Sequence, residues 1–306
     1  MTDLATYALG TDVVLLVAGF AYAAVADFRE REVSDRLWQV LGIAGFLIGF
    51  LGIAPGGAEP TILWTVVGLF VIQHLFAWDL RLGPHGERYA DLIEAVVYVS
   101  VVAIVAVAAA RWGVGPNAVP IAVIAVLVSV LFARGLFEGG ILYGGADAKA
   151  LMIAAIMVPI FTPPLLSVPA SVAPVTAFLP FAVNVLMNSA LFSVAIPVVI
   201  AVRNLRAHEF HGLSAFTGYS ISVAELPHQF VWVRDPTFGD ARQQEQSIET
   251  SEDDRRRREE IARDLQRRGV ARVWVTPQIP FVVVMAFGVG ATLLAGNVLF
   301  DVLFSL

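Results

Sequence analysis

The sequence contains no cysteine, and it contains few charged residues for its length. Without cysteine there can be no disulfide, no thiol nucleophile and no cysteine metal site. Charged residues make up only 15% of the 306 residues, whereas hydrophobic residues make up 58%. A soluble domain of this length does not need so much apolar material, so the composition indicates an integral membrane protein. The net charge of −6 argues against nucleic acid as a partner.

Long apolar runs recur along the chain. A run of about 18 residues or more can cross the hydrocarbon core as an α-helix. We therefore predict an all-α fold, a polytopic membrane helix bundle of about eight transmembrane helices with a cytoplasmic insert before the last helix. The helix at 174–201 contains Pro180 and Pro197, so we expect kinks there. The predicted helices span residues 10–26, 37–54, 61–79, 91–110, 118–137, 148–163, 174–201 and 279–304.

The first apolar run has one feature of a secretory signal peptide. Ala24-Val25-Ala26 has the small-x-small pattern of a cleavage site. However, no Lys or Arg precedes the run, and a basic cluster follows it. This arrangement favours a first transmembrane helix whose C-terminal end faces the cytoplasm.

The basic residues indicate how the helices are oriented. With the N-terminus outside, only Arg111 of the 20 Lys and Arg residues lies toward the outside. This asymmetry follows the positive-inside rule for short loops. We therefore predict a multi-pass protein of the cell membrane, in contact with lipid, with Asp27 and Asp147 at the cytoplasmic side. The predicted inner loops are residues 27–36, 80–90, 134–147 and 202–277.

Residues 202–277 differ in composition from the rest of the chain. We predict three parts: a membrane helix bundle at 1–201 that carries the candidate catalytic site, a cytoplasmic soluble insert at 202–277, and a final transmembrane helix at 278–306. Within the insert, residues 229–233 have a strand-like pattern. Ser251 to Arg268 predicts a charged helix with i,i+4 ion pairs that stops at Gly269. Contact of its arginines with lipid headgroups is an alternative.

Asp147 is the residue around which we build the candidate site. It follows Gly144-Gly145-Ala146 and precedes a hydrophobic segment. A carboxylate at the mouth of such a segment is costly in lipid, so it indicates a function and a partner group. The small residues would let a substrate backbone approach closely, so Gly144, Gly145 and Ala146 are candidates for substrate binding. Asp27, at the end of the first helix, is the candidate partner of Asp147.

Two neighbouring carboxylates suit amide hydrolysis. Since both cannot ionise easily, one keeps a proton near neutral pH. The ionised aspartate then acts as general base on water, and the protonated one donates to the carbonyl oxygen. The residues alone leave an alternative open, in which Asp27 and Asp147 merely cap or flank helices at the membrane interface.

The two aspartate regions resemble those of a known family. The stretch from Asp27 to Trp38 resembles the first aspartate region of archaeal preflagellin and prepilin peptidases, where an Asp ends the first helix and an Arg-rich turn follows. Gly144 to Asp147 looks like the second site of that family, the GxGD motif that it shares with presenilin-type proteases. Ala146 stands where the motif has its second glycine, which preserves close packing but loses some backbone freedom. Residues 273–277 are also similar to this family.

The resemblance implies a membrane-embedded aspartic endopeptidase with Asp27 and Asp147 as catalytic residues. It would cleave the class III signal peptide of prepilin/preflagellin-type precursors at the cytoplasmic face, so its partners would be pilin or archaellin precursors. No metal and no organic cofactor are implied. N-methyl transfer is not expected, because the cysteine-bearing methylation domain of bacterial relatives is absent. The sequence leaves a homo-oligomer open.

Other polar residues near the candidate site have simpler interpretations. Asp35 is a rival for the first catalytic position, but we expect it to be a group at the N-terminus of the second helix. We expect Lys149 to snorkel to the membrane interface, with tuning of the aspartate pair as the alternative. Glu94 receives no role.

Three other functions remain as alternatives. A metalloprotease would use His208 and His211, but their i,i+3 spacing differs from the HExxH pattern. An ion- or proton-coupled transporter would use Asp147 and Glu94 to line an ion or proton path, although the chain shows no symmetry between two halves. A non-catalytic scaffold of a pilus assembly machine would use residues 202–277 for docking.

Overall fold

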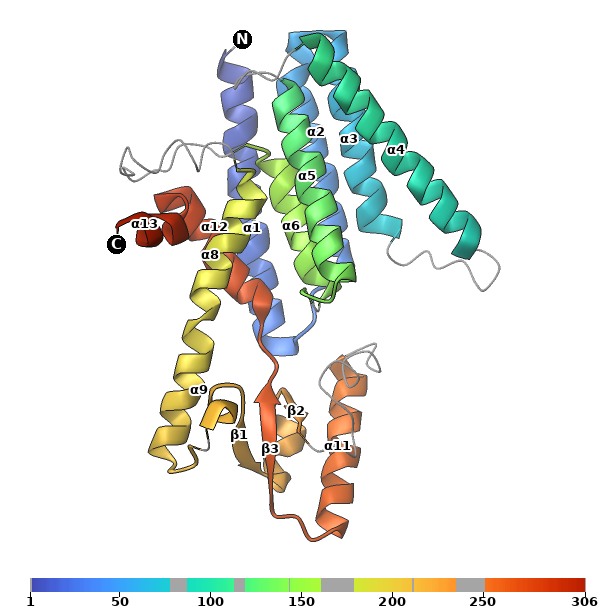
Figure 1. Cartoon of the computed structure of the whole chain (residues 1–306). Coiled ribbons are helices and arrows are strands. Elements are labelled where there is room, and N and C mark those ends of the chain that lie inside the picture. Colours follow the sequence, from blue (N-terminus) through green and yellow to red (C-terminus); the bar gives the residue numbers. More distant parts are fainter. Residues whose placement is uncertain are drawn as a thin grey trace. The chain divides into compact units, whose positions relative to one another are not determined.

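A computed structural model describes residues 2–77, 87–112, 119–142, 144–160, 179–210, 212–234 and 251–305, and most of these are helical (Figure 1). The chain forms two compact units. The first consists of Met1–Ala23, Ser34–Ser189 and Met285–Leu306, and the second of Ala24–Val33 and Ala190–Val284. The second unit is therefore wider than the predicted insert, and it includes the last turns of the first helix.

Five helical stretches in the described part of the chain are long and apolar enough to cross a membrane. This finding supports the predicted polytopic helical membrane protein, while the number of about eight spans stays a prediction. Two further apolar helices, Ala95–Arg111 and Phe281–Ala295, are shorter. The long stretches are Thr6–Glu30, Asp35–Gly56, Ala58–Phe76, Ile121–Glu138 and Phe181–Arg206. They lie in α1 (Thr2–Glu30), α2 (Asp35–Ile53) with the turn that follows it, α3 (Ala58–Ala77), α5 (Val119–Glu138), and the consecutive helices α8 (Phe181–Ser193) and α9 (Ala195–Arg206). The shorter helix Ala95–Arg111 lies in α4 (Glu87–Trp112).

The centre of the first unit is α6 (Gly145–Met157), which packs against α2, α3 and α5 (Figure 1). Every residue of α6 from Ala148 onward is buried. Glycines on α2 permit the close approach, since a Cβ added at Gly45 would lie 2.8 Å from Met157 Cγ. The helix spans about 20 Å, less than the ~30 Å hydrocarbon core. The predicted span at 148–163 is therefore too long, because Pro159 disfavours a helical conformation at Val158.

The predicted helix at 174–201 is interrupted near Pro197, one of the two prolines at which we expected kinks. α8 ends at Ser193 and α9 begins at Ala195. Pro197 explains this break. It has no N–H to donate, and in a continuous helix its ring would clash with the carbonyl group of Ser193. Pro180 does not kink a helix, because α8 starts directly after it. Residues 174–178 lie outside the described part.

The predicted last helix, 279–304, divides into α12 (Phe281–Ala295) and α13 (Val298–Ser305). Gly296 adopts a left-handed φ of 84°, which suits a helix end. The buried Asn297 then starts α13, because its Oδ1 accepts a hydrogen bond from Phe300 N at 3.1 Å. Asn188 on α8 fixes this corner, donating to Gly296 O at 2.8 Å and accepting from Val298 N at 2.9 Å.

The second unit contains a three-stranded antiparallel sheet in the order β1-β3-β2. The strands are β1 (Tyr219–Ser222), β2 (Val231–Val233) and β3 (Arg272–Pro277), with short 3-10 helices η2 (Gly212–Phe216) and η3 (Val223–His228). The all-α description therefore holds for the membrane helices, while the insert adds a small sheet. Residues 273–277, which we placed in the insert without predicting a strand there, belong to its central strand, β3.

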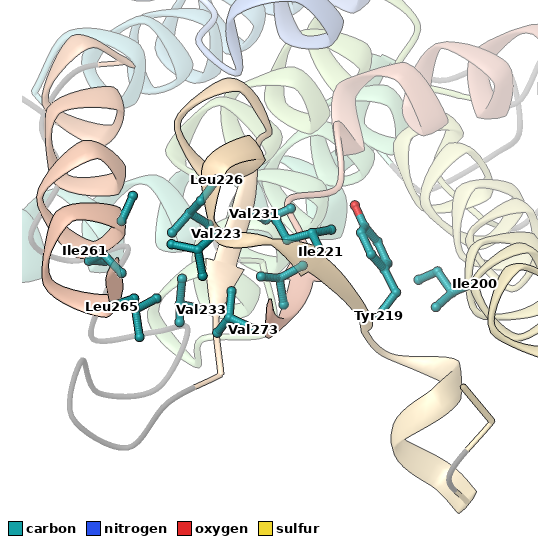
Figure 2. Packing of buried hydrophobic residues seen from close by; sticks show 12 residues of the cluster. Ile200, Tyr219, Ile221, Val223, Leu226, Val231, Val233, Ile261, Leu265 and Val273 are labelled. Carbon is teal, nitrogen blue, oxygen red and sulfur yellow. The ribbon is translucent and has the colours of Figure 1, made fainter. Parts of the chain in front are cut away.

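A cluster of apolar side chains holds this sheet to α11 (Ser251–Arg267). In Figure 2, Ile261 and Leu265 of α11 point toward Val223 and Leu226. Ile200 of α9 packs against the same cluster, so the end of that apolar helix belongs to the core of the second unit. The predicted charged helix is confirmed, including its i,i+4 ion pairs and its stop at Gly269, whose φ is 73°.

Candidate active site

Asp147 is the third residue of α6, in the first turn of the helix that Gly145 starts. Its backbone N–H donates to Gly144 O at 3.1 Å. A Cβ added at Gly144 would lie only 3.0 Å from Asp147 Oδ2. Gly144 therefore leaves space for the carboxylate of Asp147 itself. Gly145 and Ala146 are half-buried beside it.

Lys149 and Asp35 form an ion pair that the sequence did not reveal. Lys149 Nζ lies 2.6 Å from Asp35 Oδ1, and the lysine side chain is 3% exposed whereas that of Asp35 is 38% exposed. The expectation that Lys149 snorkels to an interface is therefore wrong. Asp35 is the first residue of α2, so its interpretation as a helix N-terminal group is confirmed. The pair joins the N-terminal ends of α2 and α6, two residues from Asp147.

Asp27 lies in the last turn of α1 and is buried. Its Oδ2 accepts a hydrogen bond from Val282 N at 2.9 Å. Val282 is the second residue of α12, so Asp27 supplies the side-chain oxygen that a helix N-terminus needs. The positive end of the helix dipole also favours a carboxylate there. The alternative that Asp27 caps a helix is thus correct for its geometry, although the capped helix is α12 and not its own.

Arg31 directly follows α1 and lies against the helical turn that carries Asp27. Its φ of 56° is left-handed, a conformation that non-glycine residues seldom adopt. Its backbone N–H and its Nη1 both donate to Asp27 O, at 3.1 and 3.2 Å. Burial lowers the pKa of the Arg31 guanidinium, and the charge of Asp27 acts in the opposite direction. The last turn of α1 is therefore closed by its own arginine.

The structure describes Asp27 within the second unit and Asp147 within the first. Both carboxylates belong to the N-terminal turn of a helix, α12 for Asp27 and α6 for Asp147, where free N–H groups favour an anion. Within the described residues, no group of three or more His, Asp or Glu side chains could hold a metal ion. His211 and the side chain of Glu94 lie outside the described part.

Sequence reasoning missed Val282 because its backbone N–H carries no side-chain signal. A start of α12 near Phe281 was predictable, but which carboxylate meets it depends on tertiary folding. The Lys149–Asp35 pair had a weak signal, since both residues were predicted at the cytoplasmic ends of helices.

Residues 212–298 match the family model described as Archaeal Peptidase A24 C-terminus Type II. The match contains the sheet, α11 and α12, and therefore includes Val282. It confirms the resemblance to archaeal preflagellin and prepilin peptidases from a part of the chain other than the two aspartate regions. Comparison with curated proteins gives no match.

Proposed function

From the premise that this chain carries the C-terminal region of an archaeal A24 peptidase, we propose that it is a membrane-embedded aspartic endopeptidase. The family implies a peptidase, and the aspartic type follows from the two candidate carboxylates. One observation carries the proposal: Asp27 Oδ2 accepts a hydrogen bond from Val282 N, which lies inside the matched region. Asp27, a candidate catalytic residue, is thus hydrogen-bonded to the part of the chain that matches a peptidase family.

The proposed mechanism uses Asp27 and Asp147 as a pair that shares one proton. The ionised carboxylate takes a proton from water, and the water oxygen attacks the carbonyl carbon of the scissile bond. The protonated carboxyl group donates to the carbonyl oxygen, giving a tetrahedral intermediate. Proton transfer to the amide nitrogen then breaks the C–N bond and releases the two peptides. The apparent pKa values of such a pair belong to both residues together.

The proposed substrate is the class III signal peptide of a pilin or archaellin precursor, cut at the cytoplasmic face. Gly144, Gly145 and Ala146 would admit the substrate backbone beside Asp147. The N-terminus would lie outside the cell, so that both aspartates face the cytoplasm. The soluble insert would then meet the leader of the precursor.

Cleavage of precursors in membranes tests this proposal. Asp27→Asn and Asp147→Asn should each abolish the mobility shift of the cleaved precursor while the protein still accumulates. Asp264→Asn is the matched control, because it removes a carboxylate that pairs with Arg268 on the outer side of α11. Asparagine is preferred to alanine at residue 27, since its side-chain oxygen can still accept from Val282 N.

Either aspartate variant with near-normal cleavage would refute the assigned mechanism. Wild-type protein that cuts none of several pilin and archaellin precursors would refute the substrate class and favour the transporter or scaffold alternatives.

A further inference from the structure

Phe230, which precedes β2, lies against two guanidinium groups from distant parts of the chain. Arg31 Cζ, at the end of α1, lies 5.2 Å from the ring centroid. Arg258 Cζ, on α11, lies 5.1 Å from the same centroid. Both distances are within the range of about 6 Å at which a cation is attracted to an aromatic face. One ring therefore connects the last turn of α1 with α11.

The Arg258 side of this contact is fixed by buried polar bonds. Arg258 forms an ion pair with Asp254, and both residues are 5% exposed. Gln278 donates from Nε2 to Asp254 Oδ2 at 3.2 Å, and its backbone N–H donates to Phe230 O at 2.9 Å. Because Gln278 lies just before α12, these bonds hold Phe230 and Arg258 in place beside the start of that helix.

This arrangement is costly for a contact that serves stability alone. Each buried charge loses several kcal/mol of hydration before its partners compensate it. Among the described residues, the buried Nε atoms of Arg31 and Arg258 have no hydrogen-bond partner. Arg31 is also held in a left-handed conformation. An apolar contact would join the same elements at lower cost.

The hydrogen bond that Arg31 donates indicates the role of its contact with Phe230. Its Nη1 donates to the carbonyl oxygen of Asp27, whose carboxylate accepts from Val282 N. A shift of Arg31 would therefore move the peptide group of Asp27 and with it the carboxylate. The insert reaches the candidate catalytic residue through Phe230 and Arg31.

We propose that Phe230 and Arg258 are positioning residues, which hold Arg31 and the last turn of α1 so that the Asp27 carboxylate stays on the N-terminus of α12. The proposal rests on the proposed function, because it takes Asp27 as catalytic. It makes the soluble insert a part of the catalytic apparatus.

The test compares three variants of the full chain. Phe230→Leu keeps the apolar contact but removes the aromatic face, Phe230→Tyr keeps the face, and Phe216→Leu is the control. Phe216 contacts Phe210 in the same unit. With a purified pilin precursor, Phe230→Leu should lower kcat about tenfold and leave KM within about twofold, because it misplaces a catalytic group and not the substrate. Phe230→Tyr and Phe216→Leu should keep wild-type kcat.

A second readout does not depend on catalysis. The chain has no cysteine, so Arg29→Cys introduces a single site for a nitroxide label on the exposed side of the last turn of α1. Electron paramagnetic resonance should show greater mobility of this label with Phe230→Leu, and wild-type mobility with Phe230→Tyr or Phe216→Leu.

Each combination of results decides the proposal. Unchanged kcat with Phe230→Leu overturns it, and so does a lower kcat without a change in label mobility. An equal loss of kcat in Phe230→Tyr and Phe230→Leu also overturns the proposal, because it shows that the aromatic face does not hold the two guanidinium groups. If wild-type protein cuts no precursor, the proposed function fails, whereas the label still shows whether the ring holds α1.

Discussion

Replacing Asp35 by asparagine removes the carboxylate that lies 2.6 Å from the ammonium group of Lys149. Lys149 is 3% exposed, so its charge stays in a site that water scarcely reaches. Breaking a fully buried pair in this way costs roughly 3–5 kcal/mol. Asp35 is 38% exposed, so solvent screening already weakens the pair, and we expect Asp35→Asn to cost about 1–3 kcal/mol.

The reverse substitution should be milder. Lys149→Met leaves the Asp35 carboxylate unpaired, but water can solvate that group because it is partly exposed. We therefore expect Asp35→Asn to destabilise the protein more than Lys149→Met. The double variant leaves neither charge, so it should be more stable than Asp35→Asn alone.

Thermal unfolding in detergent, followed by circular dichroism, measures this order. Arg255→Gln is the control, since Arg255 pairs with Glu259 and both side chains are exposed, so its loss should change stability by less than about 0.5 kcal/mol. A larger loss for Lys149→Met than for Asp35→Asn would refute the argument from burial. Strictly additive losses in the double variant would refute the ion pair itself.

Two further predictions concern the aspartates. Asp27→Ala removes the oxygen that accepts from Val282 N and should lower the free energy of unfolding by about 1 kcal/mol, whereas Asp27→Asn should change it little; thermal unfolding of both variants checks this, and equal losses would contradict it. Gly144→Ala should lower the rate of precursor cleavage about tenfold, since its Cβ would lie 3.0 Å from Asp147 Oδ2. Gly135→Ala is its control, because beyond its own helical turn no atom of the described residues lies within 4 Å of the added Cβ; equal rates in the two variants would contradict the steric argument.

The sequence predicted those features that depend on local patterns. The charged helix was readable because acidic residues begin it, arginines follow, and Gly269 ends it. The break after Ala295 also had a local signal in Gly296-Asn297, but the apolar residues on both sides concealed it. The strand that residues 273–277 form was not predicted, because so short a run carries little information on secondary structure.

Features of the site that depend on tertiary contacts were beyond the sequence. Asp27 and Asp147 could be selected because a carboxylate at the end of an apolar segment is unusual. No comparable signal identifies the groups that the side chains of the site contact. The bond from Asp27 to Val282, and the ion pair of Lys149 with Asp35, join residues whose proximity no periodicity encodes.

The bond between Asp27 and Val282 also has a consequence for biosynthesis. The two residues are separated by 255 positions, so the aspartate emerges from the ribosome long before the helix that it caps. At ~5–20 residues per second, the interval is roughly ten to fifty seconds. Throughout that time the nascent first helix lacks the backbone donor that orients its carboxylate. If the proposed function holds, an unfinished chain would therefore be inactive, and activity would begin only once α12 has been made and has met Asp27.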